Sequence, residues 1–287
     1  MEYHEDLVSH AYLVKHQSVY SSLKTAEKKA AEYCLKNPGR VVSAAISDIA
    51  SGADCSEATL VRFARRMGYS GFPELRMMIM NRSADRIFPY EVIARHDTIS
   101  SIVEKVFQAS IQALIDTRMM LAAEEVQKAV DALSHSGKIM FCGAGDANLV
   151  AMSGFQKFAR LGFHAEFTLD FDTQLLHVSQ LKKGDVLFCI SHSGRTKNLL
   201  TIQKIAKGNE ATIISMTNFP SSPIAKASDI ILLTATFTQN LIGEVMTKRV
   251  AELCILEAIY VAVFAGVDEE KQRTLRQTDQ ALLLNKA

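Results

Sequence analysis

The chain has 287 residues, which suggests two domains because a typical domain contains roughly 150 residues. Hydrophobic residues make up 48% of it and charged residues 22%, with five prolines and no tryptophan, so the chain is neither disordered nor collagen-like. Its 32 basic and 31 acidic residues leave a net charge of +1, which excludes a general attraction to nucleic acid or anionic membranes and requires any basic patch to be local.

The cysteines and the termini predict a cytoplasmic protein. The five cysteines are odd in number and widely spaced, so we expect reduced thiols, no disulfide framework and no metal site. We also expect no cofactor. The first twenty residues lack the basic start and apolar run of a secretory signal. Glu252 and Glu257 interrupt the most apolar stretch, residues 250–267, which therefore predicts a buried helix and no membrane contact. The cysteines are Cys34, Cys55, Cys142, Cys189 and Cys254.

Residues 1–82 predict a helical domain. Only helix-period patterns occur there, including a helix over residues 25–35 that ends at an Asn-Pro-Gly sequence. The periodicity breaks at a segment containing Pro89, so we predict a linker over residues 83–97. Residues 98–134 are again helical in pattern and begin a second domain, residues 98–287.

The second domain alternates short apolar runs with helical segments from residue 138 onward, which predicts an α/β fold: a parallel sheet covered on both faces. Two further helices, residues 244–264 and 269–284, close the chain. We expect a flavodoxin-like strand order, in which the first and third strands are neighbours. The predicted strands are Ile139–Cys142, Ala165–Leu169, Val186–Ile190, Thr212–Met216 and Ile230–Leu233.

Residues 46–67 predict two short helices joined by a tight turn. Ser56 is a good N-cap for the second helix, which has a buried stripe that includes Leu60 and Phe63, and Asp54 tolerates the left-handed conformation that the turn favours. The opposite face and the amino end present side chains as a recognition helix does in the major groove. Five arginines and one acid lie between residues 59 and 82, so the local basic patch is here, although a solvated arginine face is the plainer interpretation of such a helix. The candidate DNA-binding residues are Ser56, Glu57, Ala58, Thr59, Arg62, Arg65 and Arg66.

The continuation Met67-Gly68-Tyr69-Ser70-Gly71-Phe72 favours the DNA-binding interpretation. With it, residues 25–82 resemble the helix-turn-helix domain of the RpiR family of bacterial transcriptional regulators. The resemblance implies that this region binds operator DNA.

A second group of residues follows the first and third predicted strands. The Gly143-x-Gly145 turn is weak evidence alone, and Asn148 replaces the third glycine of a dinucleotide-binding fingerprint. The third strand leads into three hydroxyl side chains and a glycine at an expected helix amino terminus, where backbone N–H groups favour an anion such as phosphate. Walker-loop spacing is absent. Hydroxyl residues also cap helices without any ligand, but three of them together favour one.

Residues 138–266 resemble the SIS (sugar isomerase) domain, which binds phosphosugars. The resemblance makes the loop after the third strand the phosphate cradle, puts the first loop beside the sugar, and aligns Asp170 and Gln174 with polar positions after the second strand. Ala147 departs from the family, which often has a serine there, and Asp146 adds a negative charge nearby. The candidate ligand-binding residues are Gly143, Ala144, Gly145, Ser191, His192, Ser193, Gly194, Arg195, Thr196 and Glu244.

Together these features predict a DNA-binding regulator, a repressor of sugar or amino-sugar catabolism genes, and not an enzyme. We expect a sugar phosphate such as N-acetylmannosamine 6-phosphate to control operator affinity, and a symmetric homodimer or larger assembly to match two operator half-sites. The alternative is a phosphosugar isomerase with an accessory helical domain, in which Glu244 and either His192 or His177 move a proton. An arginine-faced helix favours the regulator.

Overall fold

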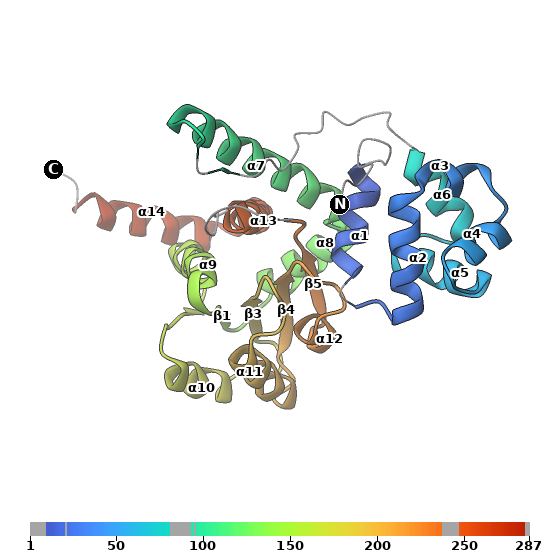
Figure 1. The fold of residues 1–287 in the computed structure, drawn as a ribbon. Helices are drawn as coiled ribbons and strands as arrows, with labels where there is room; N and C mark the ends of the chain where they lie inside the picture. The colour runs from blue at the N-terminus through green and yellow to red at the C-terminus, as the bar shows by residue number, and fades with distance from the viewer. Residues whose placement is uncertain (1–9, 21, 81–92, 95, 237–246, 285–287) are drawn as a thin grey trace.

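The structure is a computed structural model that describes residues 10–20, 22–80, 93–94, 96–236 and 247–284 (Figure 1). A bundle of helices forms the N-terminal unit, and a sheet flanked by helices forms the rest of the described chain. The bundle comprises α1 (His10–Tyr20), α2 (Thr25–Lys36), α3 (Pro38–Ser43), α4 (Ile46–Gly52), α5 (Glu57–Arg66) and α6 (Phe72–Met80).

The bundle packs around the apolar side of α5. Leu60 and Phe63 are fully buried on that side, in a single cluster with residues from all the helices of the bundle. Ser56 caps α5 by accepting a hydrogen bond from the backbone N–H of Thr59, at 3.2 Å. Asp54 has a φ of 49° in the turn between α4 and α5. The predicted cap and the predicted left-handed turn residue are thus confirmed.

The C-terminal unit contains a five-stranded parallel sheet with strand order β2-β1-β3-β4-β5, as the flavodoxin-like prediction requires. The predicted second strand is too long, because β2 ends at Glu166. Beyond it the Thr168 hydroxyl and carbonyl accept hydrogen bonds from the Asp170 N–H and the Gln174 amide, which turn the chain into the next helix. The strands are β1 (Ile139–Cys142), β2 (Ala165–Glu166), β3 (Val186–Ile190), β4 (Thr212–Thr217) and β5 (Ile230–Leu233).

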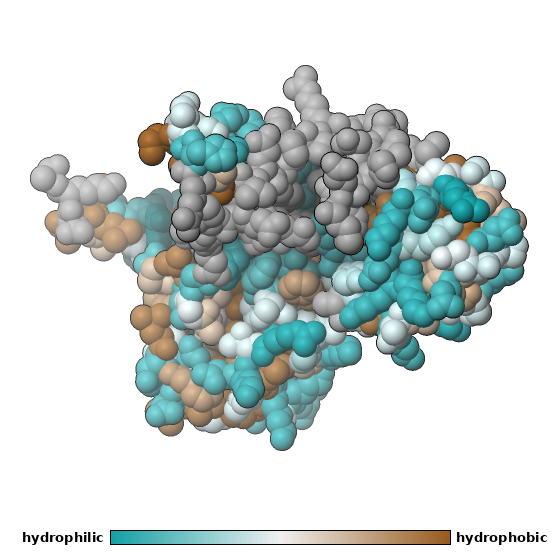
Figure 2. Space-filling view, viewed as in Figure 1, coloured by the Kyte–Doolittle hydropathy of each residue, from teal (hydrophilic) through white to brown (hydrophobic). Residues whose placement is uncertain are grey.

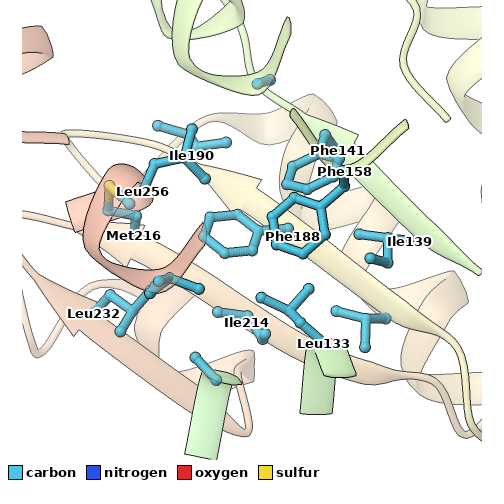
Figure 3. Packing of buried hydrophobic residues seen from close by; sticks show 14 of the residues in the cluster. Leu133, Ile139, Phe141, Phe158, Phe188, Ile190, Ile214, Met216, Leu232 and Leu256 are labelled. Atoms are coloured by element: carbon cyan, nitrogen blue, oxygen red, sulfur yellow. The ribbon is translucent and has the colours of Figure 1, made fainter. Parts of the chain in front are cut away.

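Helices cover both faces of the sheet because its strands are apolar on both sides. Alternate strand residues such as Phe141 and Phe188 face one cluster together with α8, α9 and α13 (Figure 3). Their neighbours Cys142 and Cys189 face the opposite cluster, where α10, α11 and α12 pack. The helices around the sheet are α8 (Ala123–Ser134), α9 (Asn148–Arg160), α10 (Phe171–Ser179), α11 (Lys197–Gly208), α12 (Pro223–Ala227) and α13 (Thr247–Ala265).

Two further helices pack on this outer layer. The first, α7 (Ile99–Met120), lies against α13 and also contacts α1, and α14 (Glu269–Leu283) lies against α9. Residues 98–134 therefore form two helices, α7 and α8, separated at Leu121 and Ala122, where the pattern predicts continuous helix.

The predicted linker, residues 83–97, falls mostly outside the described residues, so the domain boundaries stay predictions. None of the described helices combines the length and hydropathy needed to cross a bilayer. All five cysteines are free, and Cys142 and Cys189 lie side by side on β1 and β3. Within the described ranges, no group of three or more histidine, cysteine or acidic residues is arranged to hold a metal ion.

Candidate functional site

Helix α5 carries the candidate DNA-binding residues on a largely exposed surface. Glu57 and Ala58 are exposed at its amino end, and Arg62, Arg65 and Arg66 are exposed along it. The expectation of exposure is wrong for Thr59, whose side chain is only 3% exposed. Its hydroxyl lies 2.9 Å from the Ser56 hydroxyl, so it belongs to the cap of the helix.

Two of the arginines are held by neighbouring side chains. Arg62 donates a hydrogen bond from Nη2 to the Thr59 hydroxyl at 3.0 Å, which orients its guanidinium from within the helix. Arg66 lies 3.6 Å from the buried carboxylate of Glu27 on α2, so it also joins α5 to α2. Figure 2 shows mostly hydrophilic residues over the N-terminal helices at the right of the view. This face therefore carries three exposed arginines, two of which are oriented by neighbouring side chains.

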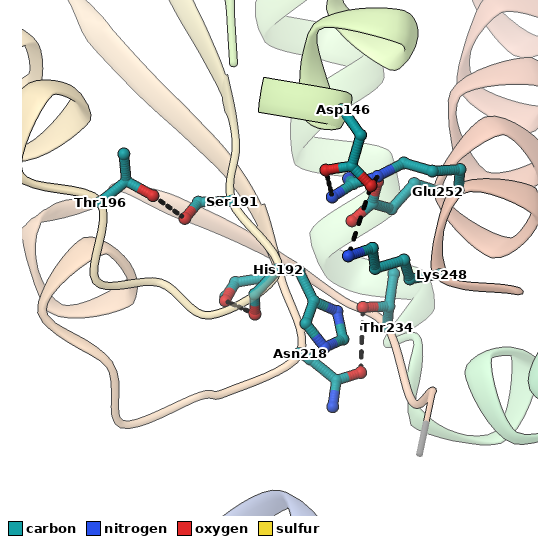
Figure 4. A network of polar contacts seen from close by, with 10 residues as sticks. Asp146, Ser191, His192, Thr196, Asn218, Thr234, Lys248 and Glu252 are labelled. Atoms are coloured by element: carbon teal, nitrogen blue, oxygen red, sulfur yellow. Dashed lines mark hydrogen bonds and ion pairs between the residues drawn. The ribbon is translucent and has the colours of Figure 1, made fainter. Parts of the chain in front are cut away.

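The loop after β3 leads into α11, whose amino terminus has no side-chain cap. Thr196 occupies the N-cap position, but its hydroxyl lies 3.1 Å from the Ser191 hydroxyl instead of capping the helix (Figure 4). The first N–H groups of a helix have no helical carbonyl to bind, and they carry the positive end of the helix dipole. The exposed Ser193 and the Ser191–Thr196 pair therefore border an amino terminus that can receive an anion.

The backbone of this loop is fixed by residues at the end of β4 and just before α12, which were not identified from the sequence. The His192 carbonyl accepts hydrogen bonds from the Thr217 hydroxyl and the Asn218 N–H, both at 3.1 Å. Gly194 has a φ of 60°, and a β-carbon there would lie 2.1 Å from the Ser222 hydroxyl oxygen. Only glycine fits this position. A run of hydroxyl and amide residues after the fourth strand is the signal that could have pointed to these supports.

The loop after β1 lies beside the loop after β3 because Cys142 pairs with Cys189 across the two strands. Gly143 is buried in a tight turn, where a β-carbon would lie 2.8 Å from the backbone of Ala147. Gly145 is exposed and has a φ of 60°. The structure thus brings the two predicted loops together at one edge of the sheet, and Ala144 lies between the two glycines in partial exposure.

Asp146, in the short 3₁₀ helix η2 (Gly145–Ala147), is not an uncompensated negative charge. Arg249 on α13 donates two hydrogen bonds to its carboxylate, at 3.0 and 2.9 Å, and the Lys248 ammonium lies 3.3 Å away. Burial raises the pKa of Asp146, but the hydrogen bond and charge of Arg249, with the charge of Lys248, outweigh it and lower the pKa. The negative charge of Asp146 is therefore balanced by two neighbouring cations.

Glu252 completes this group of charges. It is fully buried, contacts the Arg249 guanidinium, and has a pKa that burial raises to about 7 against the lowering effect of Arg249. Figure 4 shows the Ser191–Thr196 pair and the Asp146 group on opposite sides of the view, with His192 between them.

The other candidate residues have separate positions. His192 is partly buried and Arg195 is exposed in the loop after β3. Asp170 caps α10 by accepting a hydrogen bond from the Thr173 N–H at 2.7 Å. His177, in the last turn of α10, lies 3.3 Å from Glu166 on β2. Glu244 lies outside the described residues, so its predicted contact with the sugar stays a prediction.

Two family models match the chain. The helix-turn-helix domain of the rpiR family matches residues 10–86, and the SIS domain matches residues 132–262. An HTH-type transcriptional regulator of Caldanaerobacter subterraneus is 33% identical over 93% of this chain and 95% of its own length. The HTH-type transcriptional regulator HexR of Escherichia coli is 30% identical over 94% of this chain and 93% of its own.

Among solved structures, the Vibrio vulnificus NanR protein complexed with ManNAc-6P shares the fold. It matches with a TM-score of 0.61 and 23% identity over 96% of this chain and 99% of that one. The match spans both units of the described chain, so the order of a helical bundle followed by an SIS sheet is common to the two proteins.

Proposed function

Because the chain belongs to the RpiR family of helix-turn-helix transcriptional regulators and carries an SIS domain, we propose that it is a repressor of sugar or amino-sugar catabolism genes whose operator affinity is set by a sugar phosphate. In this proposal residues 1–82 bind the operator and residues 98–287 bind the effector. The observation that carries it is the uncapped amino terminus of α11, next to the loop after β1.

The phosphate is proposed to bind at α11 with the sugar over the neighbouring loop. An anion there gains hydrogen bonds from backbone N–H groups and from the hydroxyls of Ser191, Ser193 and Thr196, and it gains from the helix dipole. Arg195, exposed in the same loop, adds a positive charge. The sugar would lie against Gly143, Ala144 and Gly145, where the absence of large side chains leaves the backbone accessible.

The effector is proposed to be an amino-sugar or hexose phosphate. NanR, which has the same fold, is described as a complex with ManNAc-6P, and this makes N-acetylmannosamine 6-phosphate the first compound to try. His192 and Glu244 are the side chains we propose to face the sugar ring.

The operator is proposed to bind α5 through the exposed arginines. Arg62 is the best placed for base contact, since its guanidinium is already oriented by Thr59, and a bidentate arginine–guanine pair is the commonest specific contact in the major groove. Arg65 would neutralise backbone phosphates. Arg66 would do so as well, while keeping its contact with Glu27.

The regulator is proposed to act as a homodimer or a larger symmetric assembly. Two half-sites about 34 Å apart along one DNA face require two recognition helices related by symmetry. Large apolar side chains remain exposed along α7, which is unusual for a lone chain and fits burial against a second copy. They are Ile99, Val103, Phe107 and Ile111.

The isomerase alternative is not adopted, because near full-length relatives are named transcriptional regulators. The described part of the chain also contains the arginine-faced helix, for which an isomerase has no use. Interconversion of aldose and ketose phosphates by the purified protein would reverse this choice.

The first experiment separates the two proposed activities. Operator duplexes are selected from random-sequence DNA, and affinity is measured by fluorescence anisotropy with and without N-acetylmannosamine 6-phosphate and hexose 6-phosphates. We expect Arg62→Ala to weaken DNA binding by about 5- to 150-fold, the equivalent of about 1–3 kcal/mol, with unchanged sugar-phosphate affinity. Ser193→Ala should leave DNA binding intact and weaken sugar-phosphate binding by roughly tenfold or more, which removes the response.

Two outcomes contradict the assignment. A Ser193→Ala protein that responds like the wild type shows that the phosphate binds elsewhere, and an Arg62→Ala protein that loses both activities shows that the two units do not act separately. Thr201→Ala on the exposed surface of α11 is the matched control for Ser193→Ala and should change neither affinity.

A further inference from the structure

A group of four charged side chains joins the loop after β1 to helix α13. Arg249 binds both carboxylate oxygens of Asp146, Lys248 lies 3.3 Å from the same carboxylate, and Glu252 contacts the Arg249 guanidinium from one turn along the helix. Arg249 is only 3% exposed and Glu252 is fully buried. The charged groups that act on the pKa of Glu252 are Arg249 and Lys248, which lower it, and Asp146, which raises it.

This group fixes geometry more than it adds stability. Removing charges from water costs about as much as their attraction returns, so a buried ion pair is weak evidence for stabilisation. A bidentate arginine–carboxylate pair does, however, hold its two partners in one relative orientation. The Asp146–Arg249 pair therefore specifies where the loop after β1 lies with respect to α13.

Helix α13 is placed to pass a displacement of that loop to the rest of the molecule. It packs on α7, α8 and α9, and α7 in turn contacts α1 of the N-terminal bundle. Its outer side exposes a stripe of large apolar residues at helical spacing. These are Val250, Leu253, Val261 and Phe264.

We propose that the Asp146–Arg249 ion pair is a positioning pair that relays occupancy of the effector site to α13, and through it to α7 and the arrangement of the subunits. The inference rests on the proposed function and adds the regulation of that same site. An effector changes DNA affinity only if it binds one arrangement of the subunits better than another. In the proposed site the sugar contacts residues 143–145, which directly precede Asp146 in the chain. Removing the pair should leave the effector site and the DNA-binding site intact but abolish the coupling between them.

The pair also gives the response a pH dependence. Arg249 binds Asp146 through Nε and Nη2 and Glu252 through Nη1. When Glu252 is protonated, the guanidinium charge is attracted to Asp146 alone, and when Glu252 is ionised, that charge is divided between two carboxylates. The effector response should therefore be larger at pH 6 than at pH 8. The phosphate of the effector itself titrates at about pH 6, so the contribution of the pair is the part of the pH dependence that Glu252→Gln removes. A purely structural role predicts that Glu252→Gln removes none of it.

The experiment measures the effector-induced change in DNA affinity, with the selected duplex and N-acetylmannosamine 6-phosphate or whichever hexose 6-phosphate binds the wild type. The double variant Arg249→Met/Glu252→Gln removes both buried charges together, so no buried charge is left unpaired. We expect it to bind each ligand alone within about threefold of the wild type, while the wild-type response, typically about 5- to 150-fold, falls below about threefold. Glu252→Gln alone should keep the response and show a smaller difference between pH 6 and pH 8 than the wild type.

The matched control is Glu257→Gln, which breaks an ion pair between the same helix and Lys157 of α9, and it should respond like the wild type. Asp146→Asn serves as the second variant if the double variant does not fold, and it should also lose the response. A wild-type response in either variant refutes the relay while leaving the proposed function intact. A wild type that binds no sugar phosphate refutes the proposed function and the relay together.

Discussion

Single side chains in and before helix α5 have roles that residue type alone does not predict. Threonine occurs both in helix caps and on exposed helix faces, so the periodic pattern could not predict that Thr59 is buried. The Ser56 cap and the left-handed Asp54 were predictable because each depends on its immediate neighbours. The Asp146–Arg249 pair was not, since its members are 103 residues apart and no local pattern relates them.

His16 gives the helical bundle a specific sensitivity to acid. It is 6% exposed and lies near the rings of Tyr12, Tyr20 and Phe63, and burial lowers its pKa from 6.5 to about 4. Because the folded state favours the neutral ring, this histidine costs no stability above pH 6.5, and stability is lost as the pH falls toward 4. We expect its contribution to the free energy of unfolding to drop by about 2 kcal/mol between pH 7.5 and pH 5.

Urea denaturation followed by circular dichroism at these two pH values tests this expectation. His16→Phe should remove that part of the pH dependence, whereas His135→Gln, on the exposed end of α8, should leave it unchanged. If the free energy of unfolding falls by the same amount between the two pH values in His16→Phe and in the wild type, another group titrates.

At the scale of elements, burial decides how well the sequence predicts the fold. The limits of β1 and β3 match the prediction because central parallel strands are continuous apolar runs between turn residues. The edge strand β5 also matches, since its apolar run Ile230–Leu233 is bounded by polar residues. The edge strand β2 is shorter than predicted, because Thr168 and its neighbours form side-chain hydrogen bonds that end it. The break between α7 and α8 has no glycine or proline to mark it, so the pattern reads through it.

The packing of α9 on the sheet depends on a glycine in the middle of the helix. A β-carbon on Gly154 would lie 2.6 Å from the ring of Phe141, which is fully buried on β1. We expect Gly154→Ala to lower the free energy of unfolding by about 1–3 kcal/mol, because overpacking outweighs the higher helix propensity of alanine.

The comparison is with Gly208→Ala at the end of α11, where a β-carbon meets nothing within 4 Å. That substitution should leave the urea midpoint unchanged or raise it slightly. If the two variants behave alike, contact with Phe141 does not set the position of α9.

At the scale of the whole molecule, many large apolar side chains are exposed in the described part of the chain. Brown patches lie on the side of α9 and α10 in Figure 2, and the exposed residues of α7 and α13 form two further stripes. The sequence predicts a dimer from the symmetry of operators, but it cannot identify the contact, because an apolar helical stripe has the same pattern whether it faces its own core or a partner.

We expect Phe107→Glu to weaken self-association and, with it, the binding of a two-half-site operator. Phe107 is 65% exposed on α7, so glutamate is harmless to the monomer but places a charge in the proposed contact. Sedimentation velocity should show the monomer at concentrations where the wild type is a dimer. Leu176→Glu on α10, where the leucine is 62% exposed, is the control and should sediment like the wild type.

The uncapped amino terminus of α11 has a consequence for how the proposed regulator responds in a cell. If the effector phosphate binds there as proposed, inorganic phosphate should compete for the same site, because a helix amino terminus binds any small oxyanion. The sugar-phosphate concentration that gives half of the response should then rise with the concentration of inorganic phosphate. The regulator would respond to the ratio of the two concentrations and not to the sugar phosphate alone. Phosphate-starved cells should therefore respond to less sugar.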